Sequence, residues 1–170
     1  MSRIIWGTVA APILALALVA SWQAEASADA HTSIMELESK FTDAVKAKDL
    51  DKIMANYNNS DNLVVFDVIP PRQYTGWNAY KEDFRNFLAQ CKDSPNFEIS
   101  DLEIYGDVRV AYSHSIQHFT CTDQQGKKLD LTFRVTDGYQ NFHHQWLIWH
   151  EHVSVPVDLT TGKADLQSKP

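Results

Sequence analysis

The chain has little positive charge, since 15 Lys and Arg against 22 Asp and Glu give a formal net charge of -7. It shows neither a basic face nor a strand motif that mixes aromatic and basic residues, which are the usual marks of nucleic-acid binding. No internal repeat or low-complexity segment is visible either. Nucleic acid is therefore not expected as a partner, and the sequence is typical of one ordinary domain.

Cysteine is scarce, because the chain holds only Cys91 and Cys121. In an oxidising compartment two such residues can form one disulfide. Two separate buried thiols are the alternative. Only geometry distinguishes the two cases, so the sequence leaves both open.

Long apolar runs are also rare, and the one that exists lies at residues 4–20, directly after a short positive start at residues 1–3. Two sites of the small-x-small type follow at residues 24–26 and 28–30. These features describe a secretory signal peptide over residues 1–30, although a membrane anchor is an alternative. We expect export to a bacterial periplasm or out of the cell, with no membrane attachment after cleavage.

The remaining sequence changes from helical to strand periodicity. Apolar residues recur at helical spacing over residues 31–48, Asp49 can cap a second helix, and a third helix is expected after Gly76. Strand patterns cover residues 63–66, 97–105, 108–120, 128–136 and 145–155. This order predicts an α+β domain over residues 31–157, with three N-terminal helices packed on one face of a curved antiparallel sheet. A polar tail over residues 158–170 is expected to be loose.

The last strand carries the most information about function. At a two-residue period one face holds Trp146, Ile148, His150, His152 and Ser154, and the other holds Leu147, Trp149, Glu151 and Val153. His150 and His152 continue an apolar row where a purely structural strand more often has Val or Leu. We therefore expect this strand to line a pocket as well as a core.

Three motifs carry a resemblance to a known superfamily: residues 47–53 between the first helices, Tyr74-Thr75-Gly76, and the alternating residues 146–156. With the order of elements, they resemble ketosteroid isomerase, SnoaL-like polyketide cyclases and nuclear transport factor 2. The last motif is also similar to the association domain of calcium/calmodulin-dependent protein kinase II. The resemblance implies a cone-shaped single domain. It does not identify the chemistry, because this fold serves enzymes and assembly modules alike.

Asp67 lies where the isomerases of this superfamily keep the aspartate that moves a proton, so the resemblance implies a general base. A turn carboxylate that bonds to the backbone is the alternative. The resemblance places Phe41 and Leu131 where the isomerases carry their two hydrogen-bond donors to the enolate oxygen. Steroid isomerisation is not expected, because those donors usually supply the dominant catalytic term.

His150 and His152 allow three interpretations. Two strand histidines can ligate a metal, but His114, His118, His143 and His144 add no recognised ligand spacing. They can instead serve as acid-base groups, as the scytalone dehydratase branch of the superfamily implies, or simply fill space. We assign them as candidate catalytic residues with Asp67, and we expect neither a metal nor another cofactor.

Arg134 is the candidate for binding an anion, because the kinase association domain carries a pocket-facing arginine at the corresponding strand position. A buried guanidinium requires a carboxylate, from the protein or from a ligand. Tyr57, Tyr74 and Trp77 are the other candidate ligand-binding residues. Aromatic residues at helical spacing are, however, more often plain core.

Tyr112, His114 and Ile116 share one strand face, and alternation alone does not say which face points inward. The resemblance implies that this face lies on the outer sheet surface with Trp149 and Val153. Related folds commonly dimerise there, so a homodimer is expected. The sequence thus predicts an exported protein that binds a small organic ligand, cyclic and anionic, in the cavity of the cone. A cofactor-independent isomerase, dehydratase or cyclase is the alternative.

Overall fold

The computed structural model describes residues 11–168, with side chains from residue 29 onward. Residues 1–10 of the expected export signal lie outside the described residues, and residues 11–28 are described by their backbone alone. Within the part that is described, no helix is both long enough and apolar enough to cross a membrane.

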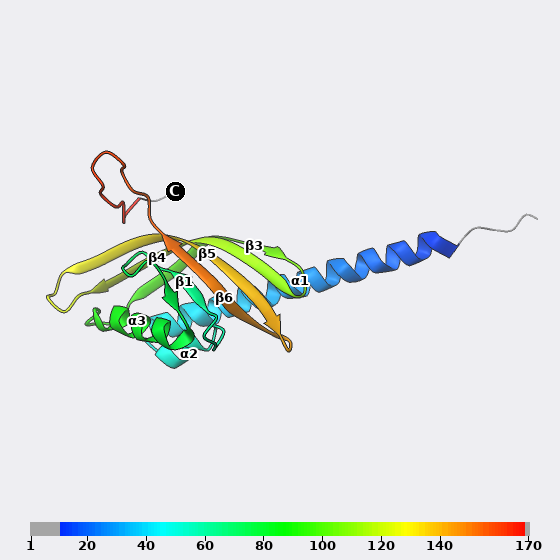
Figure 1. Ribbon diagram of the computed structural model, residues 1–170, viewed down its shortest axis with the longest axis horizontal. Helices are drawn as coiled ribbons and strands as arrows, with labels where there is room; N and C mark the ends of the chain where they lie inside the picture. The colour runs from blue at the N-terminus through cyan, green and yellow to red at the C-terminus, as the bar shows by residue number, and fades with distance from the viewer. Residues whose placement is uncertain (1–10, 169–170) are drawn as a thin grey trace, which may run out of the picture.

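Three helices pack against one face of a curved sheet, as Figure 1 shows. Helix α1 spans Ala11–Lys46, α2 spans Leu50–Met54 and α3 spans Trp77–Ala89. Local chemistry explains their boundaries. The Asp49 carboxylate accepts the backbone N–H of Lys52 at 3.1 Å and so caps α2. Gly76, with φ at 89°, occupies the position before α3 in a conformation that residues with a Cβ rarely adopt.

Six strands form one sheet in the order β2-β1-β6-β5-β4-β3. Their bounds are β1 Val64–Phe66, β2 Tyr74–Thr75, β3 Asn96–Gly106, β4 Val110–Thr122, β5 Lys128–Phe142 and β6 Gln145–Ser154. The α+β cone is confirmed. The sheet is not wholly antiparallel as expected, because the short β1 pairs parallel with β6. That pairing places residue 67, the first after β1, near the C-terminal end of β6.

A β-bulge divides β6 into two halves. Gly138 of β5 faces His150, whereas the next residue, Tyr139, faces Ile148, so Trp149 is the extra residue. Ile148 is buried on the inner face, and Glu151 is the next residue to be buried there. The alternation read from the sequence therefore reverses at the bulge.

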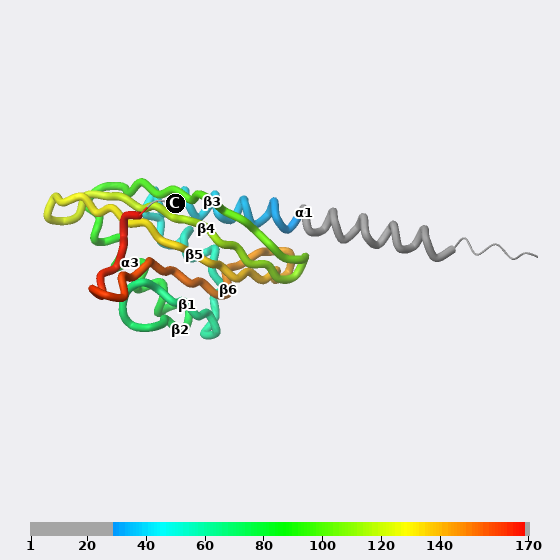
Figure 2. The backbone as a smooth tube through the Cα atoms, turned by 90° about the horizontal axis from the view of Figure 1, so that it is seen from above, coloured from blue at the N-terminus to red at the C-terminus, as the bar shows by residue number. Residues whose placement is uncertain are grey.

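The C-terminal segment is held in place rather than loose as expected. Val157 pairs with Ala164 in a β-bridge, and the carbonyl oxygen of Leu166 accepts the backbone N–H of Thr132 at 2.8 Å. Figure 2 shows this segment, in red, turning back across the sheet from the end of β6. We call residues 157–166 the tail hairpin.

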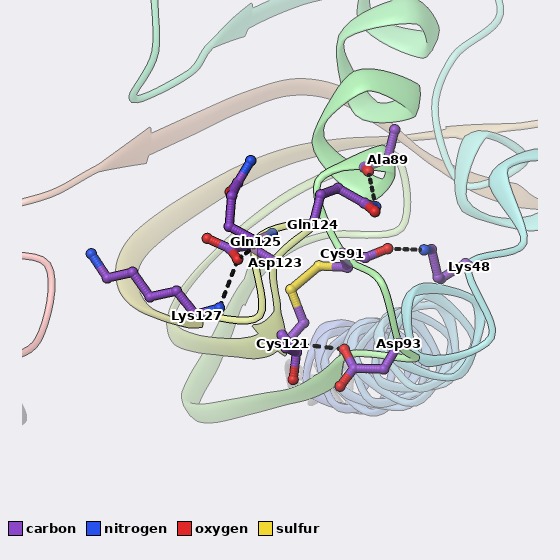
Figure 3. Close-up of a disulfide and its surroundings, with 10 residues drawn as sticks. Lys48, Ala89, Cys91, Asp93, Cys121, Asp123, Gln124, Gln125 and Lys127 are labelled. Atoms are coloured by element: carbon purple, nitrogen blue, oxygen red, sulfur yellow. Dashed lines mark hydrogen bonds between the residues drawn. A yellow bond between two sulfur atoms is a disulfide. The ribbon is translucent and has the colours of Figure 1, made fainter.

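Cys91 and Cys121 form a disulfide, with Cα atoms 5.7 Å apart, that joins the end of α3 to β4 (Figure 3). The surrounding loops are tied by hydrogen bonds from Lys48 Nζ to the Cys91 carbonyl oxygen at 2.6 Å and from Gln124 to the carbonyl oxygen of Ala89 at 2.8 Å. The end of α3 is therefore linked covalently to the sheet. Of the two arrangements left open by the sequence, the structure has the bonded one.

Candidate functional site

A cavity of about 370 Å³ lies between α1, α3 and the inner face of the sheet. Its wall is mainly apolar, and the phenylalanines that contribute are Phe41, Phe84, Phe87, Phe97, Phe119 and Phe133. Three carboxyl groups interrupt this apolar lining: Asp67, Asp83 and Glu151. The volume suits a small organic molecule, for which such apolar pockets with few polar groups are typical.

Asp67 follows β1 and is half-buried at the cavity wall. Its Oδ1 accepts the backbone N–H of Val68 at 2.5 Å. Burial is the largest cause of the rise in the pKa of Asp67 from 3.8 to about 7; the negative charges of Glu151 and Asp83 add to this rise, and backbone hydrogen bonds oppose it. A carboxyl group with a pKa near neutrality can both accept and donate a proton at physiological pH.

Asp83 projects from the inner face of α3, three residues after the buried Tyr80. The Tyr74 hydroxyl donates to Asp83 Oδ1 at 2.7 Å. Burial raises the pKa of Asp83, although the hydrogen bonds from Tyr74 and Asp67 oppose that rise. Tyr74, a predicted ligand-binding residue, is thus outside the lining and holds a carboxyl group that belongs to it.

Glu151 is buried on the inner face of β6 and accepts two phenol hydroxyls. Tyr57 donates to Oε2 at 2.6 Å, and Tyr80 donates to Oε1. Burial raises the pKa of Glu151, and both hydrogen bonds lower it. Burial also raises the pKa values of the two tyrosines well above their usual 10, so both remain hydroxyl donors. The predicted residue Tyr57 therefore acts on the cavity through Glu151.

The acidic groups continue beneath the cavity along the inner sheet face. Asp137 of β5 lies directly opposite Glu151 on β6 and Ser113 on β4. Burial, followed by the charges of Glu151 and Glu38, raises the pKa of Asp137 well above its usual value. The Tyr139 hydroxyl donates to Glu38 Oε1 at 2.5 Å and lies 2.8 Å from Ser113 Oγ.

These five acids form one polar cluster under the helices: Glu38, Asp67, Asp83, Asp137 and Glu151. Among the side chains that the structure describes, none of the five forms an ion pair with a lysine, arginine or histidine. Burial without counter-charge favours the protonated carboxyl group. Burial therefore raises the pKa of each of the five acids and shifts the cluster toward its protonated form.

His150 and His152 lie on the opposite face of the sheet. The His150 Nδ1–H donates to the Val64 carbonyl oxygen at 2.8 Å, and both rings meet the Phe66 ring edge-on at centroid distances of 5.0 and 5.7 Å. Neither lines the cavity. Their prediction as catalytic residues in the cavity is wrong, because the bulge at Trp149 turns them outward and brings Glu151 and Val153 inward.

Arg134 is exposed on the outer face of β5, between its partners Ile116 and Ser154. The prediction that it binds an anion inside the cone is therefore wrong. Trp77 is also outside the lining: its Nε1–H donates to the Met54 carbonyl oxygen at 3.0 Å, and its ring lies 4.8 Å from the Lys81 ammonium. It contributes to packing of α3 on α2 rather than to the cavity wall.

Phe41 and Leu131, which replace the two expected donors, both line the cavity. No group of three or more His, Cys, Asp or Glu side chains within the described residues has the geometry of a metal site. The positively charged and imidazole side chains are also absent from the described cavity lining. The site thus offers acid-base groups and an apolar surface.

Four of the five acids were not predicted from the sequence, although each has a sequence feature that indicates burial. Glu38 falls at helical spacing with the buried residues Ile34 and Phe41, and Asp83 follows Tyr80 in the same way. Asp137 alternates with the buried Val135 and Tyr139 in β5. An acid at an apolar position of a helix or strand is the signal of a buried carboxyl group. Glu151 was correctly predicted to lie on the opposite strand face from His150 and His152.

Comparisons with known proteins agree on one family. The model of the SnoaL-like domain matches residues 34–158. A crystal structure of a nuclear transport factor 2-like protein of unknown function from Pseudomonas putida KT2440 shares 30% identity, covers 85% of this chain and 99% of its own, and has a TM-score of 0.75. None of the curated proteins compared with the chain matches it.

Two further solved structures share the fold at lower identity. A protein from Xanthomonas campestris, described provisionally as a calcium/calmodulin-dependent protein kinase II association domain, is 23% identical over 71% of this chain and 84% of its own, with a TM-score of 0.62. A protein from Streptomyces avermitilis, described provisionally as a dehydratase, is 12% identical over 72% and 93%, also with a TM-score of 0.62.

Proposed function

Because this chain belongs to the SnoaL-like domain family, we propose that its cavity holds a neutral, largely apolar organic molecule and that Asp67 exchanges a proton with it. The aromatic lining supports the apolar character of the ligand. The carboxyl groups, with no positive charge in the described lining, disfavour the anionic ligand expected from the sequence. A carbonyl compound fits, since it is neutral and can accept a hydrogen bond from a protonated acid.

The state of Asp67 is the observation that carries this proposal. Glu151 and Asp83 each accept phenol hydroxyls, whereas the partners of Asp67 are backbone N–H groups and the Asp83 carboxyl group. Its pKa of about 7 suits a general base or acid at neutral pH. Removal of a proton next to a carbonyl group, or its return at another carbon, is chemistry that such a carboxylate performs without a cofactor.

Binding without turnover is the second candidate. Phe41 and Leu131 provide no donor for a developing enolate oxygen, and such donors usually supply the largest part of the rate enhancement. Family members include both enzymes and non-catalytic modules, so membership alone does not choose between the two.

Two fluorescent probes test the binding part. Prodan is a neutral naphthyl ketone whose emission shifts to the blue in apolar surroundings, and anilinonaphthalene sulfonate is an anion of similar size. We expect the protein to bind prodan with a blue shift and to bind the sulfonate at least about tenfold more weakly. Equal affinity for both probes would contradict a cavity that selects neutral ligands.

Hydrogen exchange on a small ketone tests the proton transfer. The protein is incubated with β-tetralone in heavy water, and loss of the protons next to the carbonyl is followed by NMR. We expect the parent to accelerate exchange, with a rate that rises as Asp67 ionises around pH 7. Asp67→Asn should lower the protein-catalysed rate by about a hundredfold or more, whereas Asp61→Asn at an exposed site should not. Equal rates in the parent and Asp67→Asn, with prodan still bound, would leave the binding function alone standing.

A further inference from the structure

The tail hairpin is a small ordered unit with its own hydrogen bonds. The Asp158 backbone N–H donates to the Lys163 carbonyl oxygen at 2.9 Å, and that of Asp165 donates to the Pro156 carbonyl oxygen at 2.8 Å. Gly162, with φ at 69°, makes the turn and donates to the Asp158 carbonyl oxygen at 2.7 Å. The hairpin therefore arrives at the sheet as a formed element.

The hairpin contacts β5 beyond the point where β6 ends. Pairing of β5 with β6 ends at Arg134 and Ser154. Two residues further along β5, the Thr132 N–H is free of β6 and donates to the Leu166 carbonyl oxygen at 2.8 Å. Figure 2 shows the red segment crossing the sheet at this end. The tail hairpin thus lies against β5 at this end of the sheet.

Two side chains of the hairpin reach the cavity. Ala164 and Leu166 are part of its lining, which also includes Leu131 of β5, Val153 of β6 and Val155 just after β6. These five lining side chains are all aliphatic. Leu166 remains 37% exposed, so it separates the cavity from solvent.

We infer that the tail hairpin is the closing wall of the ligand cavity, and that Leu166 and Ala164 determine how long a ligand the cavity accepts. This inference rests on the proposed function, since it concerns the same cavity. A side chain that ends a pocket sets the size of its occupant, because a longer ligand must displace it and a shorter one leaves a gap. The wall is held to β5 through one backbone hydrogen bond, so it is the part of the lining that is most easily moved.

A matched pair of probes tests the assignment. Prodan and laurdan carry the same neutral fluorophore and differ only in the length of the acyl chain. The parent should bind prodan and discriminate against laurdan. Leu166→Ala should reduce this discrimination by about tenfold, and Ala164→Phe should weaken prodan binding by a similar factor, since it fills the same end. Leu159→Ala is the control, because Leu159 lies in the same hairpin and is 95% exposed.

A measurement without ligand distinguishes loss of the hairpin contact from a general folding defect. In the parent the Thr132 amide should be protected from hydrogen exchange, and in a chain that stops after Pro156 this protection should be lost while that of β4 and β5 elsewhere is kept. If the parent binds prodan but all variants show the same ratio of prodan to laurdan affinity, the closing wall is elsewhere and the proposed function stands. If the parent binds neither probe, both proposals are overturned.

Discussion

Replacing Glu38 by glutamine should stabilise the protein at alkaline pH and leave it nearly unchanged at acid pH. Glu38 is 4% exposed on α1 and accepts the Tyr139 hydroxyl at 2.5 Å. Burial raises its pKa from 4.5 to about 7, and the charge of Glu151 adds to the rise against the hydrogen bond from Tyr139. Glutamine has a similar shape and can still accept that hydroxyl, but it never acquires a charge.

The sign follows from the direction of this shift. The folded protein holds the Glu38 proton more tightly than the unfolded chain. The contribution of this proton to the free energy of unfolding is therefore fully present below about pH 4.5 and is lost as the pH rises through 7. A pKa rise from 4.5 to about 7 corresponds to about 3 kcal/mol of unfolding free energy. Glu38→Gln should recover up to about that amount at pH 8.

Urea unfolding at several pH values between about 5 and 8 measures this difference. The control is Glu36→Gln, two residues earlier in α1, where the side chain is exposed and 3.8 Å from Lys40. It should not reproduce the pH-dependent gain. If the difference in unfolding free energy between the parent and Glu38→Gln is the same at every pH, Glu38 does not titrate in this range and the account of the acid cluster is wrong.

Three other predictions concern the disulfide, the outer face and the N-terminus. Replacing both Cys91 and Cys121 by serine should lower the free energy of unfolding by about 3 to 4 kcal/mol, because the bond closes a loop between residues 30 positions apart; an unchanged urea midpoint would contradict this. Tyr112→Glu, on the outer sheet face where Tyr112 is 50% exposed, should convert a dimeric parent to monomers in light scattering; a parent that is already monomeric removes that prediction. N-terminal sequencing of protein from the native host should find a cleaved chain, whereas intact Met1 in a membrane fraction would contradict export. The expected first residue lies near Ser27, Asp29 or His31.

The elements could be predicted from the sequence because local chemistry determines them. The Asp49 cap, the glycine before α3 and the alternation in β4 each depend on residues that are neighbours in the chain. The family resemblance correctly placed Tyr112 and His114 on the outer face, where both are exposed, but its placement of Val153 there is wrong, because Val153 lines the cavity. The family resemblance added the order of the elements in space, which is confirmed.

The site could not be predicted in the same way, because one residue changed the outcome. The extra residue Trp149 reverses the alternation, so that Glu151 and Val153 line the cavity and the two histidines do not. Gly138, opposite the bulge, was a local hint, because a glycine inside a strand often marks a bulge. A β-bulge depends on pairing between strands, which no short stretch of sequence specifies.

The tail shows a second limit of local patterns. A polar composition predicts a loose end, yet residues 157–166 are ordered because a backbone N–H of β5 lacks a partner beyond the end of β6. This unpaired N–H results from the fold, and nothing in the sequence of the tail indicates it. Sequence patterns thus described this chain well within each element and poorly where one element completes another.

The bond between Cys91 and Cys121 makes the cavity wall depend on whether the surroundings are oxidising or reducing. Gln90, which caps α3 just before Cys91, and Phe119, two residues before Cys121 in β4, both line the cavity. Thiols are kept reduced in the cytosol and become paired in oxidising compartments. With the export expected from the sequence and the ligand binding proposed above, oxidation of Cys91 and Cys121 should make this part of the cavity wall more rigid and tighten ligand binding.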